Sequence, residues 1–197
     1  SLILVERAVT INGGDKTLSF TGLKDIAGTE DDGLIIFAET TVNNLIVDAG
    51  LDTPSTWVGT YAIHVYNTKA TLNNVKATGG NGGILVNGSD VVLTGNIDVS
   101  GNGFGGIEVS NGEGLTAPSL DVTGVTTFTN DSEAYGKPTI WEDNVTNTVT
   151  TGGNQFITND KVAENQVQYY LLAKNAIDKT ALEIATGAMN AKVYTEF

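Results

Sequence analysis

The 197-residue chain contains 23 acidic and 10 basic residues, which give a formal net charge of −13, and 40% of its residues are hydrophobic. This balance argues against nucleic acid and anionic membrane surfaces as partners, because both are bound through Lys and Arg. The absence of Cys excludes disulfides and thiol chemistry, and no apolar run approaches the ~18 residues that suggest a membrane-inserted helix. We expect one domain that meets neutral sugars, cations or basic partners.

The sequence begins with a strand-like apolar run over residues 1–5 and has no starting Met. We therefore expect it to be a piece of a longer exported bacterial protein, secreted or held at the cell surface, with other domains of the same chain as neighbours. No signal peptide is visible, and an internal piece would not carry one.

One short segment recurs five times along the chain. Four copies have a small residue, an apolar residue, a variable residue and a second apolar residue, which is the alternation of a half-buried strand, and the fifth has Glu142 in the last of these positions. The copies occupy residues 33–37, 61–67, 83–87, 106–110 and 139–143. Their first apolar residues are Leu34, Ile63, Ile84, Ile107 and Ile140, spaced 21 to 33 residues apart. A repeat of this length indicates a stacked solenoid.

A second strand follows each copy, again with apolar residues at every other position. Its apolar pairs are Leu45 with Val47, Val75 with Ala77, Ile97 with Val99, and Leu120 with Val122. Residues 9–11 and 18–20 supply an earlier unit, and no unit has a helical pattern long enough for a βαβ crossover. The sequence therefore predicts an all-β parallel β-helix (solenoid) of about six coils over residues 1–158.

Polar residues precede the second strands at equivalent places. They are Asn44, Asn74 and Asn96, with Ser119 in the next coil. Stacking would place them in a column about 4.8 Å apart, where side-chain amides hydrogen-bond along the column and satisfy the backbone of the turn. We predict a structural asparagine ladder.

The coil pattern and this ladder, together with segments 8–20 and 101–110, resemble the right-handed β-helix modules of the pectin-lyase-like superfamily. Among these, the chain looks most like the non-catalytic modules of cell-surface proteins from Gram-positive bacteria. The resemblance covers roughly residues 1–158. It implies the fold more than the function, because that superfamily includes lyases, hydrolases, adhesins and inert spacers.

The pattern changes after Asp160. Residues 162–172 fit either a last strand or the start of a helix, and residues 173–189 have the apolar side of a helix. The end of a β-helix exposes unpaired strand edges that need a cover. We predict that residues 159–197 form a cap, largely helical, or lead into a following domain.

The connections between second and first strands differ in length at one corner only. The two middle connections, 78–82 and 100–105, are short, whereas 21–32, 48–60 and 123–138 are long. Long loops that flank short ones predict a groove over the middle coils, and loops on a rigid scaffold often bind ligands. The alternative is that these loops only cover sheet edges.

The residues between and after the apolar pairs of the first strands point outward. They form two columns: Ile35, His64, Leu85, Glu108 and Trp141; and Phe37, Tyr66, Asn87, Ser110 and Asp143. An outer face this rich in apolar and aromatic side chains usually marks a binding surface, and flat aromatic rings with nearby polar groups suit sugars. We predict a ligand site of Trp141, Tyr66, His64, Phe37, Glu108 and Asn87. Two alternatives stay open: the C-terminal tail covers this face, or another protein binds it.

Two further aromatic residues lie in loops. Trp57 is in a long loop, and Phe104 is in a Gly-rich corner. We include Trp57 in the predicted ligand site, although a loop Trp often only pins its own loop.

Acidic clusters in the long loops suggest a metal. Glu30, Asp31 and Asp32 are adjacent, Asp48 lies near Asp52, and a third cluster spans 131–133. Ca²⁺ prefers several carboxylate and carbonyl oxygens, so the first cluster is the candidate Ca²⁺ site, although none has EF-hand spacing. Solvated acidic loops without any cofactor are the alternative.

Catalytic motifs are weak. Asp31 and Asp32 resemble the paired aspartates of β-helix polygalacturonases, but the Gly-His-Gly and Arg-Ile-Lys segments of that family are absent. Arg7 is the only Arg, and no carboxylate set matches the other conceivable bases, which are Lys69, Lys76 and Lys137. We therefore assign no catalytic residues and predict an extracellular binding or adhesion module for a polysaccharide or cell-wall glycan. The alternatives are a polysaccharide lyase or glycoside hydrolase of this fold, and a spacer or protein-binding adhesin.

Overall fold

A computed structural model of the chain shows an all-β arrangement in two sheets. It describes residues 2–26, 28–55, 59–131, 137–152, 156–171 and 192–193. Every regular element within these residues is a β-strand. None of them is a helix long and apolar enough to span a membrane.

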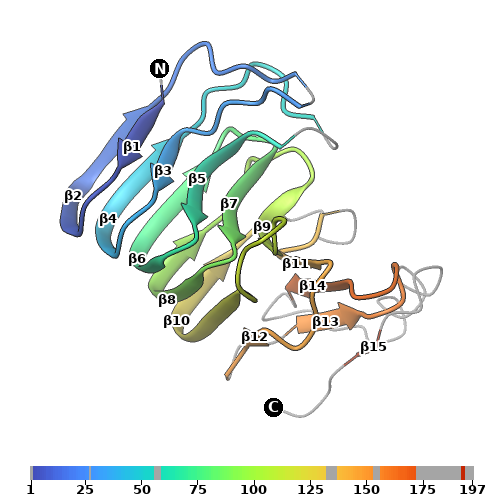
Figure 1. The fold of residues 1–197 in the computed structure, drawn as a ribbon. Helices are drawn as coiled ribbons and strands as arrows, with labels where there is room; N and C mark the ends of the chain where they lie inside the picture. Colours follow the sequence, from blue (N-terminus) through green and yellow to red (C-terminus); the bar gives the residue numbers. More distant parts are fainter. Residues whose placement is uncertain are drawn as a thin grey trace.

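The first sheet has nine strands. Six of them run parallel in the order β1 (Ile3–Val5), β3 (Leu34–Ile36), β5 (Tyr61–Tyr66), β7 (Gly82–Asn87), β9 (Gly105–Ser110) and β11 (Ile140–Asp143). Three antiparallel strands extend the sheet beyond β11, namely β14 (Val167–Leu171), β13 (Phe156–Asn159) and β15 (Lys192–Val193). The N-terminal strand and these last strands lie at opposite ends of the stack (Figure 1).

The second sheet is parallel throughout. Its six strands are β2 (Val9–Ser19), β4 (Thr40–Asp48), β6 (Lys69–Thr78), β8 (Asp90–Asp98), β10 (Ser119–Thr129) and β12 (Val149–Thr150). From β1 to β12 the chain passes alternately between the two sheets, and successive passages stack on one another (Figure 1). Alternating, stacked parallel strands are compatible with a β-helix or another solenoid.

The register of the first sheet confirms the alignment of the five repeats. Five apolar residues of successive strands pair with one another, and each is at most 1% exposed: Leu34, Ile63, Ile84, Ile107 and Ile140. They form the inner face of the first sheet and pack against the second. Each such side chain contributes about 1.5–3 kcal/mol through burial.

One predicted strand alignment is wrong in the second sheet. Leu120 pairs with Val91, at the start of the neighbouring strand, and Phe128 is the residue that pairs with Ile97. Strand β10 is longer than β8 and contains two register shifts after Asp121. These irregularities displace its second half, and a search for regular alternation therefore selects the wrong half of the strand.

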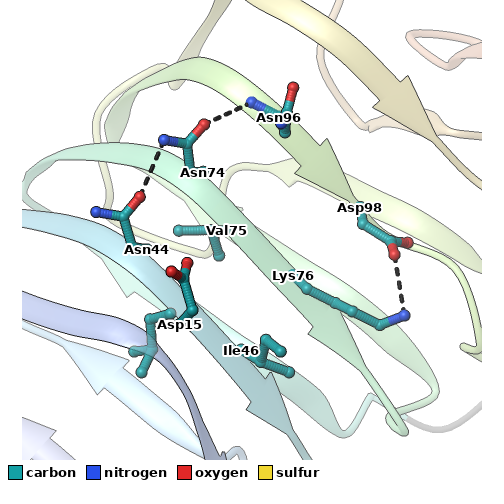
Figure 2. Close-up of a pocket in the computed structure, with 9 residues that line it drawn as sticks. Asp15, Asn44, Ile46, Asn74, Val75, Lys76, Asn96 and Asp98 are labelled. Carbon is teal, nitrogen blue, oxygen red and sulfur yellow. Dashed lines mark hydrogen bonds and ion pairs between the residues drawn. The ribbon is translucent and has the colours of Figure 1, made fainter.

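The asparagine ladder is present through its first three members. The Asn74 amide donates to the Asn44 side-chain oxygen over 3.0 Å, and the Asn96 backbone N–H donates to the Asn74 oxygen over 2.9 Å (Figure 2). Asn44 and Asn74 have positive φ angles of 53° and 52°, a backbone region that Asn tolerates better than most residues. Ser119 is not a member, because it lies at the start of β10 and donates to Asp90.

A second ladder runs beside the first, and the sequence pattern did not predict it. It joins Asn12, Asn43, Asn73 and Thr94 through side-chain hydrogen bonds of 3.0, 3.3 and 3.1 Å. Both ladders lie where the long strands of the second sheet bend, so they satisfy polar groups at that corner.

The structure of the C-terminal segment decides between a strand and a helix for residues 162–172. Of the two predictions for 162–172, the strand is correct, because β14 pairs antiparallel with both β11 and β13. The predicted helix over 173–189 lies outside the described residues. The predicted domain boundary falls at the end of β13, and strands on both sides of it belong to the first sheet.

Candidate functional site

A pocket of about 430 Å³ lies on the outer face of the first sheet. Strands β5, β7, β9 and β11 supply most of its lining, and the long loops before β3 and β5 contribute Glu30 and Gly59. The connections before β7 and β9 are short, over 79–81 and 99–104. The pocket therefore occupies the place where the loop lengths predict a groove.

Three aromatic rings form one wall of this pocket. Phe104 stands between Tyr61 and Trp141, with ring centroids 6.0 and 5.6 Å away and interplanar angles of 80° and 79°. These are edge-to-face contacts, which aromatic rings favour. Gly82 makes room for them, because a Cβ atom there would overlap the Tyr61 ring and lie 3.0 Å from Phe104.

Glu108 is one of three acidic residues in the described lining of the pocket. The Tyr61 hydroxyl donates a hydrogen bond to its carboxylate. Burial raises the pKa of Glu108, and the charge of Asp143 raises it further, which together outweigh the Tyr61 hydrogen bond. Burial, followed by the negative charge of Glu108, also raises the pKa of the Tyr61 hydroxyl well above its ordinary value. The site thus holds a carboxyl group that takes up a proton more readily than an exposed one.

Neighbouring loops and strands hold the other polar lining residues in place. The Asp143 carboxylate accepts a 2.6 Å hydrogen bond from the Gln166 amide, and the Asn87 side-chain oxygen accepts one of 2.9 Å from the Gly112 N–H. Within the described part of the chain, the buried indole nitrogen of Trp141 has no hydrogen-bond partner. The pocket therefore contains acceptors whose directions are set by neighbouring residues.

The outer face carries a second aromatic cluster beside the pocket. Tyr66 packs edge-on against Phe37 and His64, at 5.6 and 5.7 Å between centroids. Asn87 joins this cluster to the pocket, because its amide nitrogen lies 3.5 Å from His64 Nε2 while the residue also lines the cavity. The structure thus divides the predicted ligand residues into two adjacent groups.

The pocket group contains Trp141, Glu108 and Asn87 from the predicted ligand site. His64, Tyr66 and Phe37 form the neighbouring cluster and do not line the described pocket. The first outward column has the predicted register, since Ile35, His64, Leu85, Glu108 and Trp141 pair in sequence across the sheet. In the second column Tyr66, Asn87, Ser110 and Asp143 also pair, while Phe37 lies just after β3. Trp57 lies outside the described residues.

The three adjacent acidic residues of the predicted calcium site have separate environments. Asp32 accepts from the Tyr61 N–H over 2.7 Å and lies 2.6 Å from His64 Nδ1, whereas Asp31 accepts from the Lys24 N–H over 3.2 Å. Glu30 lines the pocket. In the described ranges, no group of three or more His, Cys, Asp and Glu side chains is placed to hold a metal ion.

The lysines proposed as conceivable bases have acidic partners away from the pocket. Lys76 pairs with Asp98 at 2.9 Å on the second sheet, and Lys137 pairs with Asp131 at 3.2 Å. No described residue that lines the pocket is Lys or Arg. A lyase mechanism that uses a basic side chain therefore gains no support from the described lining.

Tyr61 is the pocket residue that the sequence pattern did not identify. It stands two positions before Ile63, so strict alternation assigns its side chain to the core. Its ring instead lies over Gly82, which is its partner in the neighbouring strand. An aromatic residue opposite a glycine in an aligned strand is the signal that could have identified it.

A smaller hollow of about 210 Å³ lies beside the asparagine ladder on the second sheet. Figure 2 shows its lining, where Asn44 and Asn74 are joined by a hydrogen bond and Lys76 is paired with Asp98. Most of its polar side chains are therefore already engaged with one another, and we interpret it as part of the structural ladder.

Comparisons of the chain with protein-family models, with curated proteins and with solved structures found no match.

Proposed function

We propose that this chain is a non-catalytic extracellular module that binds a polysaccharide in the pocket on its first sheet. In this proposal the fold is a right-handed parallel β-helix of about six coils, similar to pectin-lyase-like modules and closed by a C-terminal cap. The parent protein is exported and displayed at the cell surface, where the module adheres to a glycan.

The observation that carries the proposal is the composition of the pocket. Its wall of Tyr61, Phe104 and Trp141 offers apolar rings, and Asn87, Ser110 and Asp143 offer polar groups beside them. Sugar rings have apolar faces and polar edges, so they match a wall of this kind. A volume of about 430 Å³ also falls within the ordinary range for ligand sites.

The test is retention on insoluble cellulose, chitin, pectin and peptidoglycan, with the supernatant assayed for released sugar. We expect retention on at least one polymer, no product, and a loss of about tenfold or more in affinity for Trp141→Ala, because a central aromatic side chain often dominates binding. Val92→Ala is the matched control, since Val92 is an exposed apolar residue on the second sheet.

Two outcomes would contradict this proposal. Equal retention of Trp141→Ala and Val92→Ala would show that the pocket is not the binding site. A lack of retention of the wild-type chain on every polymer would favour a spacer or a protein-binding adhesin instead.

One observation favours a second candidate function, glycoside hydrolysis. Glu108, whose pKa is raised, shares the pocket with Asp143 of the adjacent strand. Two carboxyl groups in different environments are what such hydrolysis requires, with the one of higher pKa as the general acid. Release of reducing sugar by the wild type, abolished in Glu108→Gln, would establish this function and overturn the non-catalytic one.

A further inference from the structure

The charged residues in the described lining of the pocket are all acidic. Glu30, Glu108 and Asp143 line it, and no basic side chain is among its described lining residues. The nearest basic group that acts on Glu108 is His64, which is itself paired with Asp32 at 2.6 Å. The net charge of the whole chain is −13, so the surroundings add to the negative potential of the pocket.

Neutral groups hold these carboxylates and leave their charge uncompensated. Glu108 accepts from the Tyr61 hydroxyl, and Asp143 accepts from the Gln166 amide. These hydrogen bonds fix the direction of each carboxylate without supplying a positive charge. A ligand that brings a cation would therefore offset the repulsion between Glu108 and Asp143, which adds to the effect of burial in raising the pKa of Glu108.

The aromatic wall favours the same ligand chemistry. Phe104 and Trp141 lie beside these carboxylates, and an ammonium group over an aromatic face is attracted by the ring electrons. Uronates and sulfated sugars bring negative charge and are repelled here. The site thus suits a ring that has an apolar face and a positive charge.

We infer that the pocket selects an amine-bearing sugar, namely an unacetylated 2-amino sugar unit within a polysaccharide. The inference rests on the proposed polysaccharide-binding function of this same pocket. In this arrangement the sugar ring packs on the aromatic wall, and its protonated amine lies between Glu108 and Asp143. A lysine side chain has the same charge, but its narrow alkyl chain leaves much of the roughly 430 Å³ volume unfilled.

The test compares four oligosaccharides of equal length by calorimetry at low and high salt. They are the hexamers of glucosamine, N-acetylglucosamine and glucose, and oligogalacturonate. We expect the wild type to bind the glucosamine hexamer about tenfold or more tightly than the other three, and the preference to decrease with salt, as for charge pairs near a surface.

Three variants separate the pocket from the general surface charge. Glu108→Gln and Asp143→Asn keep the shape of the side chain and an oxygen that accepts the observed hydrogen bond, and each is expected to lower the preference for glucosamine several-fold while glucose-hexamer binding persists. Glu113→Gln removes the same charge from an exposed loop position outside the pocket and is expected to keep the preference.

Each contrary outcome identifies which proposal fails. Equal affinity for the hexamers of glucosamine, N-acetylglucosamine and glucose overturns the amine selection and leaves polysaccharide binding intact. The same conclusion follows if Glu113→Gln lowers the preference for glucosamine as much as Glu108→Gln and Asp143→Asn do. Binding of none of the four overturns the polysaccharide function as well. Tighter binding of a hexalysine peptide than of the glucosamine hexamer overturns the sugar in favour of a basic protein partner.

Discussion

The two sheets share one core, yet a carboxyl group on the outer face of one has a raised pKa and a carboxyl group on the outer face of the other has a lowered pKa. On the first sheet, burial and the nearby Asp143 raise the pKa of Glu108. On the second sheet, burial also acts on Asp98, but hydrogen bonds from Ser100 and Lys76 outweigh it and lower the pKa of that carboxyl. On the ladder face Asp98 forms an ion pair with Lys76, whereas the described lining of the pocket holds carboxyl groups beside aromatic rings and no Lys or Arg. A difference of this kind distinguishes a candidate binding surface from a structural one.

The largest expected effect comes from a substitution in the core that both faces share. Ile84 is fully buried between its neighbours in the first sheet. Ile84→Ala should lower the free energy of unfolding by about 2–5 kcal/mol, because it deletes buried methyl groups and leaves a cavity. Urea unfolding measures this change. A loss below about 1 kcal/mol would contradict the assigned packing.

The next effect concerns the ladder face alone. Asn74→Ala removes hydrogen bonds to Asn44 and Asn96 and places alanine at a φ of 52°. We expect a loss of about 2–3 kcal/mol in unfolding free energy with no change in sugar binding. Asn74→Gly is the matched control, since glycine tolerates this φ, and it should recover about 1 kcal/mol of that loss. Equal stability of the two variants would remove the backbone part of the explanation.

A smaller effect on stability concerns the pocket face. Gly82→Ala introduces a Cβ atom that overlaps the Tyr61 ring. The ring must shift, so we expect a loss of about 1–3 kcal/mol in unfolding free energy together with weaker sugar binding. The readouts are thermal melting and calorimetry. Unchanged affinity in a folded Gly82→Ala protein would show that the Tyr61 ring does not contribute to binding.

The smallest effect is the pH dependence of stability. A carboxyl group with a raised pKa binds its proton more tightly when folded, so the contribution of Glu108 is present at low pH and is lost as pH rises through its folded pKa. Asp98 has a lowered pKa, so its contribution is present at higher pH and is lost as pH falls through its folded pKa. Each contribution should be on the order of 1 kcal/mol, because a shift of one pKa unit corresponds to about 1.4 kcal/mol. Solvent screening reduces the contribution of Asp98 further, since Asp98 is more exposed than Glu108.

Variants that neutralise one carboxyl group at a time separate these two opposite pH dependences of stability. Melting temperatures between about pH 4 and about pH 8 span the ordinary carboxyl range. Glu108→Gln should reduce the loss of stability on raising the pH, and Asp98→Asn should reduce the loss on lowering it. The same pH dependence in both variants would contradict the contrast between the faces.

The five repeat strands of the first sheet could be predicted from the sequence, whereas the antiparallel strands beyond β11 could not. Four of these repeats have one small residue and two apolar residues in strict alternation, so a register that buries Leu34 must also bury Ile63 and Ile84. The outward columns follow from the same alternation. Alternation alone therefore predicts that Glu108 and Trp141 share one face, and their pairing in β9 and β11 confirms it.

The second sheet and the details of the site were harder to predict from the sequence. Register shifts in β10 displaced Leu120 from its predicted partner, and no period reveals such irregularities. The pairing of Asp32 with His64 joins residues 32 positions apart through a loop of irregular conformation. Tyr61 departs from alternation because Gly82 leaves space for its ring. The first two features depend on local irregularity and loop geometry, which residue patterns do not encode, whereas the alignment of Tyr61 with Gly82 was a usable signal.

The central claim is that the pocket face binds sugar and the ladder face does not, and the most direct test is NMR with the glucosamine and glucose hexamers. The chain has only two Trp residues, so the indole N–H signal of Trp141 is identified by its loss in Trp141→Phe. The account predicts that this signal and the Glu108 amide shift on titration, while the side-chain amides of Asn44 and Asn74 stay fixed. Shifts at the ladder amides with an unchanged Trp141 indole would contradict it.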